Sequence, residues 1–309
     1  MKNLLLLLVL VLLANSSYSQ IIHHNLTVDV NIQSNTIDVI DSLKLPVDLF
    51  ENSGEAAFYL NNNLKLNSID KRFKIVKSDT EDVDSNRAVT LTKYSIKFPE
   101  TDDKFLLIPI QYEGIIKHEI VEGAAEYARG FSETSGIVFE KGVYLAGSTY
   151  WVPNFEVSEM STFELTATID KDWNVVSQGE RVENELSGDK MTIKYVSPHP
   201  MDEIYFIAAK WTEYSQQHGN VLVQAFLRTP DKELADRYLN VTADYIRLYQ
   251  DLIGEYPYTK FALVENFWET GYGMPSFTLL GETVIRFPWI LHSSYPKQRD
   301  KRNITVCSR

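Results

Sequence analysis

Short segments of alternating or β-branched residues follow one another from residue 20 to about residue 211, separated by turn residues. This succession limits that region to a mainly β fold built of antiparallel sheets. Alternation is most regular where Phe163, Leu165, Ala167 and Ile169 would share one face of a strand. Strands are predicted at 26–32, 37–45, 73–76, 88–98, 104–112, 163–169, 190–195 and 204–211. The polar segments 78–86 and 180–189 are instead interpreted as exposed hairpin connections.

The pattern changes after Trp211. Residues 220–228 form one more predicted strand, and Thr229, Pro230 and Asp231 are typical of a helix start. Strands are again predicted at 261–266 and 277–285. A helix over 230–253 is predicted from apolar residues spaced by three and four, which would form one buried stripe: Leu234, Tyr238, Val241, Tyr245, Leu248 and Leu252. The fold class is therefore mainly β (20–215) followed by α+β (216–296).

Residues 1–19 have the three parts of a secretory signal peptide: Lys2, an apolar run from Leu4 to Leu13, and small residues before Gln20. The run is shorter than the roughly 20 residues that a spanning helix needs. We therefore expect an exported, periplasmic or extracellular chain with no transmembrane segment after cleavage. Since Cys307 is the only cysteine, no internal disulfide is possible.

Charge is distributed unevenly along the chain. The formal net charge of −12 repels phosphate backbones, so we expect no nucleic-acid partner. Residues 297–309, by contrast, form an atypical basic tail. Two interpretations of this tail remain open: a natural solvated tail, or loss of the reading frame near Lys297.

No segment carries a complete catalytic signature. Gly271 and Gly273 lack the third glycine and the following helix of a nucleotide loop, and no serine stands in a nucleophile elbow. A zinc-binding His-Glu-x-x-His helix is approached only at His118-Glu119, where Glu122 takes the place of the second histidine. We interpret this segment as a strand end, so the sequence predicts no catalytic residue and no metal ligand.

Residues 255–281 resemble the zinc aminopeptidase family of membrane alanyl aminopeptidase and leukotriene hydrolase, a group of gluzincins. In that family a helix ends in a proline turn, a strand follows, and a Gly-x-Met-Glu-Asn loop lines the substrate cleft. Here Pro257 and the stretch Gly273-Met274-Pro275-Ser276 stand in that order. Upstream, 143–153 resembles the aromatic and proline segment of the family's N-terminal β-domain, and the resemblance extends over about 21–296.

The resemblance implies an N-terminal antiparallel β saddle or sandwich domain, followed by the incomplete start of a thermolysin-like catalytic domain. It also implies a peptide substrate. The implied substrate-binding residues are Gly271, Tyr272, Gly273, Met274, Pro275 and Ser276. Because Pro275 replaces the glutamate that binds the free amino terminus in the family, strict aminopeptidase specificity is not expected. The backbone of 271–274 could still pair with an extended peptide, as an edge strand does.

Zinc is the family's cofactor, and the His-Glu-x-x-His helix would follow soon after this loop. We expect that the chain is truncated before this motif, holds no cofactor and is inactive by itself. The incomplete domain would then expose apolar surface and favour association or proteolytic loss. Two alternatives remain: a secreted, non-catalytic β-domain that acts as a binding module, and an independent enzyme built on Glu265, Glu269 and Glu282.

Overall fold

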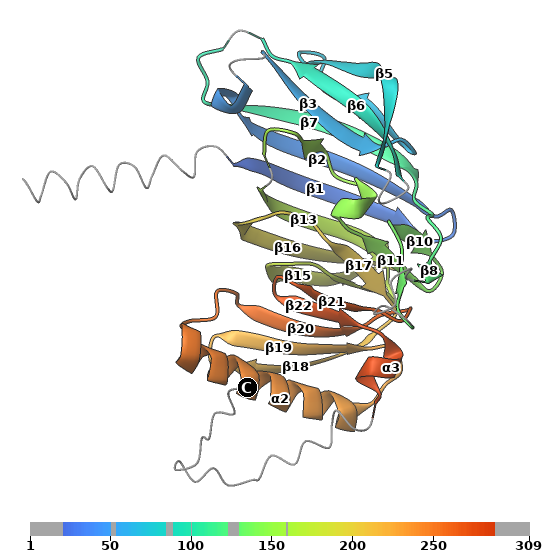
Figure 1. Cartoon of the computed structure of the whole chain (residues 1–309), viewed down its shortest axis with the longest axis vertical. Coiled ribbons are helices and arrows are strands. Elements are labelled where there is room, and N and C mark those ends of the chain that lie inside the picture. Colours follow the sequence, from blue (N-terminus) through green and yellow to red (C-terminus); the bar gives the residue numbers. More distant parts are fainter. Residues whose placement is uncertain are drawn as a thin grey trace, which may run out of the picture.

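A computed structural model describes residues 21–50, 54–84, 89–99, 101–122, 130–158 and 160–287. The predicted signal peptide and the basic tail lie outside these residues. Figure 1 shows an elongated molecule in which strands are stacked along the long axis and one long helix, α2, covers the end. Most described residues lie in antiparallel strands, which confirms the mainly β fold. None of the helices in this part of the chain has the length and apolar character needed to cross a membrane.

The largest sheet has seven strands in the order β15-β16-β13-β1-β2-β7-β4. Its pairs are antiparallel except β1 with β13, which are parallel with Leu26 opposite Leu165. Alternate residues of β1, such as Leu26 and Val28, point into the core. The strand bounds are β1 (Ile22–Asn31), β2 (Thr36–Pro46), β4 (Leu64–Ser68), β7 (Phe105–Ile115), β13 (Ser161–Asp170), β15 (Glu180–Ser187) and β16 (Lys190–Met201).

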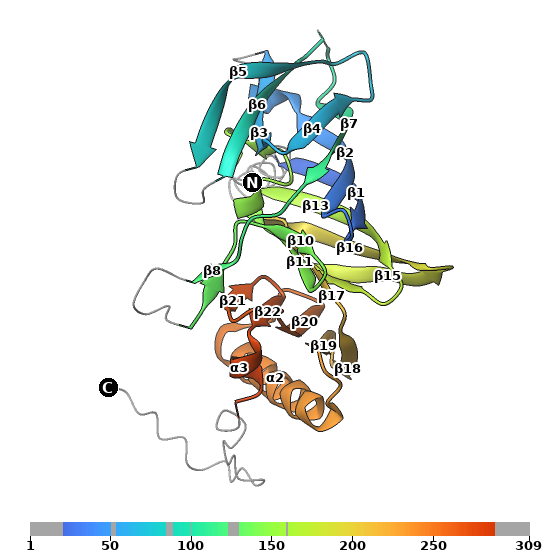
Figure 2. The same ribbon diagram turned by 90° about the vertical axis from the view of Figure 1, so that its right-hand side faces the viewer.

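Two four-stranded sheets, β12-β3-β6-β5 and β10-β11-β17-β14, pack on the core side of this sheet. One buried cluster contains residues of all three sheets, including Leu26, Phe58 and Phe206, so they share a core. Figure 2 shows them as layers. The bounds are β3 (Glu55–Asn61), β5 (Lys74–Asp84), β6 (Val89–Lys97), β10 (Ile137–Phe139), β11 (Gly142–Leu145), β12 (Asn154–Phe155), β14 (Asn174–Val176) and β17 (Phe206–Ala209); the pair β8 (Val121–Glu122) and β9 (Ser132–Glu133) and the 3-10 turns η2 (Val47–Phe50) and η4 (Gly147–Thr149) complete this part.

A five-stranded sheet, β18-β19-β20-β22-β21, follows. Helix α2 covers one face, where Leu234 and Ile246 pack with Leu263, and the other face packs on the β-region through Phe226 and Val264. The bounds are β18 (Thr212–His218), β19 (Val221–Leu227), α2 (Lys232–Ile253), β20 (Lys260–Glu265), β21 (Gly271–Met274), β22 (Phe277–Leu280) and α3 (Glu282–Ile285). Because β18 begins at Thr212, residues 212–215 already belong to this sheet; the division into domains stays a prediction.

Helix α2 is present as predicted, but its buried stripe is only partly the predicted one. Asp231, rather than Thr229, caps the helix, because its carboxylate accepts a hydrogen bond from the Leu234 N–H at 2.9 Å. The residues that face the core are Leu234, Ala235, Tyr238, Leu239, Ala243 and Ile246. Val241, Tyr245 and Leu252 are 47%, 47% and 67% exposed, so three of the six predicted stripe residues face solvent.

Three segment predictions were wrong. The described part of 78–86 continues β5 to Asp84, and 180–189 contains β15 rather than a loop. Both strands lie at the edges of their sheets. Polar and charged side chains are common on edge strands, which are more exposed to solvent than central strands. The predicted strand 277–285 stops at Leu280, since Gly281 begins the short helix α3 and Ile285 is buried beside α2.

Candidate functional site

The predicted loop 271–276 is a β-hairpin. Strand β21 pairs with β22 in antiparallel register, with Met274 opposite Phe277, and Pro275 and Ser276 form the two-residue turn. Proline fixes the backbone of the first turn position, and Ser276 has φ 68°, as in a type II turn. A non-glycine residue at positive φ is uncommon, so a specific contact is expected to hold it there.

Lys260 makes that contact. Its side chain is almost fully buried, and Nζ lies 3.0 Å from Oγ of Ser276. The rings of Tyr195 and Phe277 each lie 5.6 Å from Nζ. Burial, with a smaller contribution from the positive charge of Arg181, lowers the pKa of Lys260 to about 7. The buried amine of Lys260 therefore holds the turn between β21 and β22 in place.

Strand β21 is the outermost strand of its sheet in the described structure. A two-residue turn makes Met274 and Phe277 a hydrogen-bonded pair, and such pairs alternate along an antiparallel ladder. Gly271 and Gly273 therefore direct their N–H and C=O groups toward the open edge. Both glycines are exposed, and a Cβ added at Gly273 would meet no atom within 4 Å. This edge can accept another strand.

A groove of about 570 Å³ runs beside β21, which we call the β21 groove. Tyr144 and Tyr272 stack with ring centroids 6.3 Å apart, and Trp268 meets Tyr144 edge-on at 5.1 Å. Two hydrogen bonds fix Ser132 of β9 beside the segment that precedes β21. The Ser132 carbonyl accepts from Trp268 Nε1 at 3.0 Å, and the Ser132 N–H donates to the Glu269 carbonyl at 2.7 Å. The lining residues are His118, Glu119, Val121, Glu133, Thr134, Ser135, Tyr144, Ala146, Ser148, Glu203, Tyr205, Tyr272, Gly273 and Met274.

The β21 groove is acidic. Glu119, Glu133 and Glu203 line it, and none of its described lining residues is lysine or arginine. Glu203 is oriented by the Gly147 N–H, which donates to its carboxylate at 2.9 Å. Burial lowers the pKa of His118, so its imidazole is neutral near pH 7. The groove would favour a cationic ligand.

The structure brings some of the predicted site residues together. Tyr272, Gly273 and Met274 line the groove, Gly271 begins the same strand, and Pro275 and Ser276 form the turn, with Ser276 buried. Their part in substrate binding stays a prediction. Sequence analysis assigned no groove role to Glu119, Glu133, Glu203 or Tyr144, because only the fold brings their distant segments together.

The carboxylates Glu265, Glu269 and Glu282 do not form an independent catalytic set. Glu265 is 1% exposed, accepts from Arg286 Nε at 2.8 Å and also accepts from the Arg228 N–H at 2.7 Å. Glu269 accepts from the N–H of Thr283 at 3.0 Å at the start of α3. These two carboxylates hold α3 and its neighbours, which is a structural role.

Comparison with solved structures finds the same fold. An M1 zinc metallopeptidase from Deinococcus radiodurans superposes with a TM-score of 0.59 at 12% sequence identity, over 87% of this chain and 62% of that chain. Native yeast LTA4 hydrolase gives 0.58 at 16% identity, over 87% and 42%. No protein-family model and no curated protein sequence matches the chain.

The described chain is thus a mainly β protein with the fold of zinc metallopeptidases, as the resemblance implied. The chain spans less than two thirds of the length of the solved structures it matches.

Since the structural neighbours from Deinococcus radiodurans are zinc metallopeptidases, the residues of this chain can be tested for their fit to a zinc ion. Zinc sites need three or four His, Cys, Asp or Glu side chains around one point. Within the described residues no group of three comes together. His24 is hydrogen-bonded to Asp41, His118 to Asn61, and His199 packs on the ring of Tyr258. The described part of the chain therefore does not fit zinc.

Proposed function

We propose that this chain is the peptide-binding front part of a protein of the zinc metallopeptidase family. One observation carries the proposal: the open edge of β21 presents the backbone of Gly271 and Gly273 along a groove with aromatic walls. An extended peptide would add to this edge as a further strand. Strand addition uses only backbone N–H and C=O groups, because side chains project above and below a sheet rather than between its strands.

The groove supports a preference among peptides. Peptide side chains would alternate between the Tyr144 and Tyr272 rings and the opposite wall. With Glu119, Glu133 and Glu203 around the groove, basic peptides are preferred over acidic ones, and binding weakens at high salt. Pro275 offers no carboxylate at the position where the resemblance implies a grip on the free amino terminus.

Binding without cleavage is the second part of the proposal. The 309-residue sequence contains no His-Glu-x-x-His, and the described residues offer no group of zinc ligands. A zinc peptidase mechanism requires the metal as Lewis acid and source of the nucleophile. The chain therefore binds peptides without hydrolysing them, and residues 1–19 direct it out of the cytoplasm.

A self-sufficient secreted binding module is the second candidate. It is favoured by the buried cluster that α2 shares with its own sheet, in which Leu234, Tyr238 and Leu263 pack together. Both candidates use the β21 groove. In the first candidate, further chain or another molecule would cover the exposed side of α2, whereas the self-sufficient module needs no such cover.

The test is peptide binding by fluorescence anisotropy, with labelled basic and acidic decapeptides and the full chain. Gly273→Pro removes the outward N–H, and proline is tolerated at such an edge position. Gly273→Ala keeps the N–H and its methyl group meets no atom, which makes it the matched control. We expect about tenfold weaker binding for Gly273→Pro and little change for Gly273→Ala. Equal binding by both variants contradicts the edge-strand proposal.

Zinc content and cleavage test the second part separately. Elemental analysis of the purified chain and hydrolysis of amino-acid amides and longer peptides are expected to show neither zinc nor cleavage. Stoichiometric zinc with chelator-sensitive cleavage would overturn the proposal that the chain is inactive. The proposal of peptide binding is tested independently by the anisotropy measurement.

A further inference from the structure

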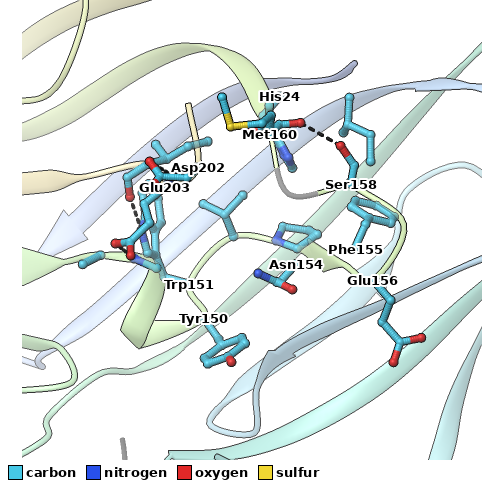
Figure 3. Close-up of a pocket in the computed structure, with 17 residues that line it drawn as sticks. His24, Tyr150, Trp151, Asn154, Phe155, Glu156, Ser158, Met160, Asp202 and Glu203 are labelled. Carbon is cyan, nitrogen blue, oxygen red and sulfur yellow. Dashed lines mark hydrogen bonds between the residues drawn. The ribbon is translucent and has the colours of Figure 1, made fainter. Parts of the chain in front are cut away.

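A second cavity of about 320 Å³ lies away from β21, between β1 and the segment that follows β11. We call it the His24 pocket; Figure 3 shows the residues that line it. It shares only Ala146 and Glu203 with the β21 groove. Its size lies at the lower end of the range of roughly 300 to 1,000 Å³ for small-molecule sites.

A buried imidazole borders this pocket. His24 points to the core side of β1 and is 2% exposed, and its Nδ1 lies 2.7 Å from Oδ2 of Asp41, which is 0% exposed. Asp41 does not line the pocket, so the ring edge that carries Nε2 is the edge that meets the cavity. Among the described residues, no group forms a hydrogen bond with Nε2.

His24 Nε2 is not among the fully buried side-chain atoms that lack a hydrogen-bond partner in the described structure, so it is open to the pocket, where water or a ligand can reach it. Polar side chains inside folded proteins are nearly always satisfied by protein groups or by ordered water. Because a carboxylate accepts hydrogen bonds, Nδ1 of His24 carries the proton that is bonded to Asp41, and in the neutral imidazole Nε2 is then an acceptor. The pocket therefore contains an oriented hydrogen-bond acceptor that has no partner in the described structure.

The walls of the pocket define what could fill it. Trp151, Phe155 and Ile204 are buried apolar walls, and the indole N–H of Trp151 is already satisfied by the Ile204 carbonyl at 3.0 Å. Asp202 and Glu203 stand on one side, as Figure 3 shows. No lysine or arginine is among the described lining residues. The site combines an acceptor, carboxylates and aromatic surface.

We propose that the His24 pocket binds a small primary amine with an aromatic or apolar body. The ammonium group donates one hydrogen bond to His24 Nε2 and is attracted by Asp202 and Glu203. The body packs on Trp151 and Phe155, where a nearby cation also gains from the aromatic faces. The His24 pocket shares Glu203 with the β21 groove but does not include β21, so a failure of amine binding leaves the β21 edge proposal unaffected.

The test measures binding of benzylamine to the full chain. Calorimetry gives the affinity, and NMR follows the 15N resonances of the imidazole. Benzyl alcohol is the matched neutral ligand, and phenylacetate the anionic one. We expect saturable binding of benzylamine with a shift of the His24 Nε2 resonance, at least about tenfold weaker binding of benzyl alcohol, and none of phenylacetate. Equal binding of benzylamine and benzyl alcohol, or no movement of Nε2, overturns the proposal.

Two variants assign the site. His24→Phe combined with Asp41→Asn keeps the ring shape and leaves no unpaired buried charge, and it is expected to abolish binding. A second variant, Asp202→Asn, is expected to fold normally, because Asp202 is exposed and asparagine keeps the side-chain oxygen that accepts a hydrogen bond from the Glu203 N–H. It is expected to weaken benzylamine several-fold, while Asp251→Asn on the exposed side of α2 has no effect. Unchanged affinity in Asp202→Asn contradicts the proposed place of the ammonium group.

Discussion

Nζ of Lys260 donates a 3.0 Å hydrogen bond to Oγ of Ser276 and so holds a serine at φ 68° in the turn between β21 and β22. The lysine belongs to β20, so the contact connects the centre of the sheet with the tip of its edge hairpin. The geometry of the β21 groove thus depends on a buried amine that does not line it.

The turn gives the first prediction. Ser276→Ala keeps a Cβ at positive φ and removes the partner of Lys260, so the free energy of unfolding should fall by about 2 kcal/mol. Ser276→Gly also removes the hydroxyl but relieves the backbone strain, so it should be about 1 kcal/mol less destabilising. Urea denaturation measures both. If alanine is tolerated as well as glycine, the turn is not strained.

Stability should depend on pH through Lys260. Its pKa is about 7 in the folded chain against an ordinary value of 10.5. Between these values the unfolded chain keeps a proton that the folded chain releases, so stability rises with pH by up to about 1.4 kcal/mol per unit. Below about pH 7 both states carry the proton, and this contribution to the slope vanishes.

The variant Lys260→Met removes that group. Denaturation at pH 7, 8 and 9 should show a smaller rise in stability for the variant than for the wild type. Parallel curves for the two proteins would mean that the amine is not buried in the folded state.

The pair Glu265 and Arg286 is predicted to be structural. Glu265 is 1% exposed, so Arg286→Ala leaves a buried carboxylate without its cation and should lower stability by about 3 kcal/mol. Glu282→Ala, on the exposed side of the same arginine, is the control and should change stability by less than about 0.5 kcal/mol. Thermal unfolding compares them; similar melting temperatures for both variants would contradict this assignment.

Helix α2 exposes a second apolar face. Val241, Tyr245 and Leu252 recur at helical spacing and are all more than 40% exposed. We expect concentration-dependent association of the chain, measured by analytical ultracentrifugation, and its loss in Val241→Lys with Leu252→Lys. A wild-type chain that stays monomeric at all concentrations would favour the self-sufficient binding module.

The sequence predicted most of the fold, for identifiable reasons. Strands with a buried face, such as β13, alternate clearly, and Asp231 to Gly254 carries start and stop signals for α2. Edge strand β15 was missed because alternation arises only where one face is covered. The buried side of α2 was misjudged in its second half, because helical spacing alone does not say which of two apolar stripes meets the sheet.

The candidate sites were predictable only where they are local. Gly273 and Pro275 identified the segment 271–276 only through the resemblance to a family loop, and the hairpin itself was not predicted. The glutamates of the β21 groove come from three segments, and His24 meets Asp41 through the pairing of β1 with β2. No motif connects residues that only strand pairing brings together.

Addition of a peptide to the open edge of β21 can be observed by amide hydrogen exchange, followed by NMR. With a saturating basic decapeptide, we expect slower exchange of the outward amides of Gly271 and Gly273, with the inward amide of Tyr272 unchanged. If the peptide binds but leaves both glycine amides unprotected, it does not add to β21 as a strand.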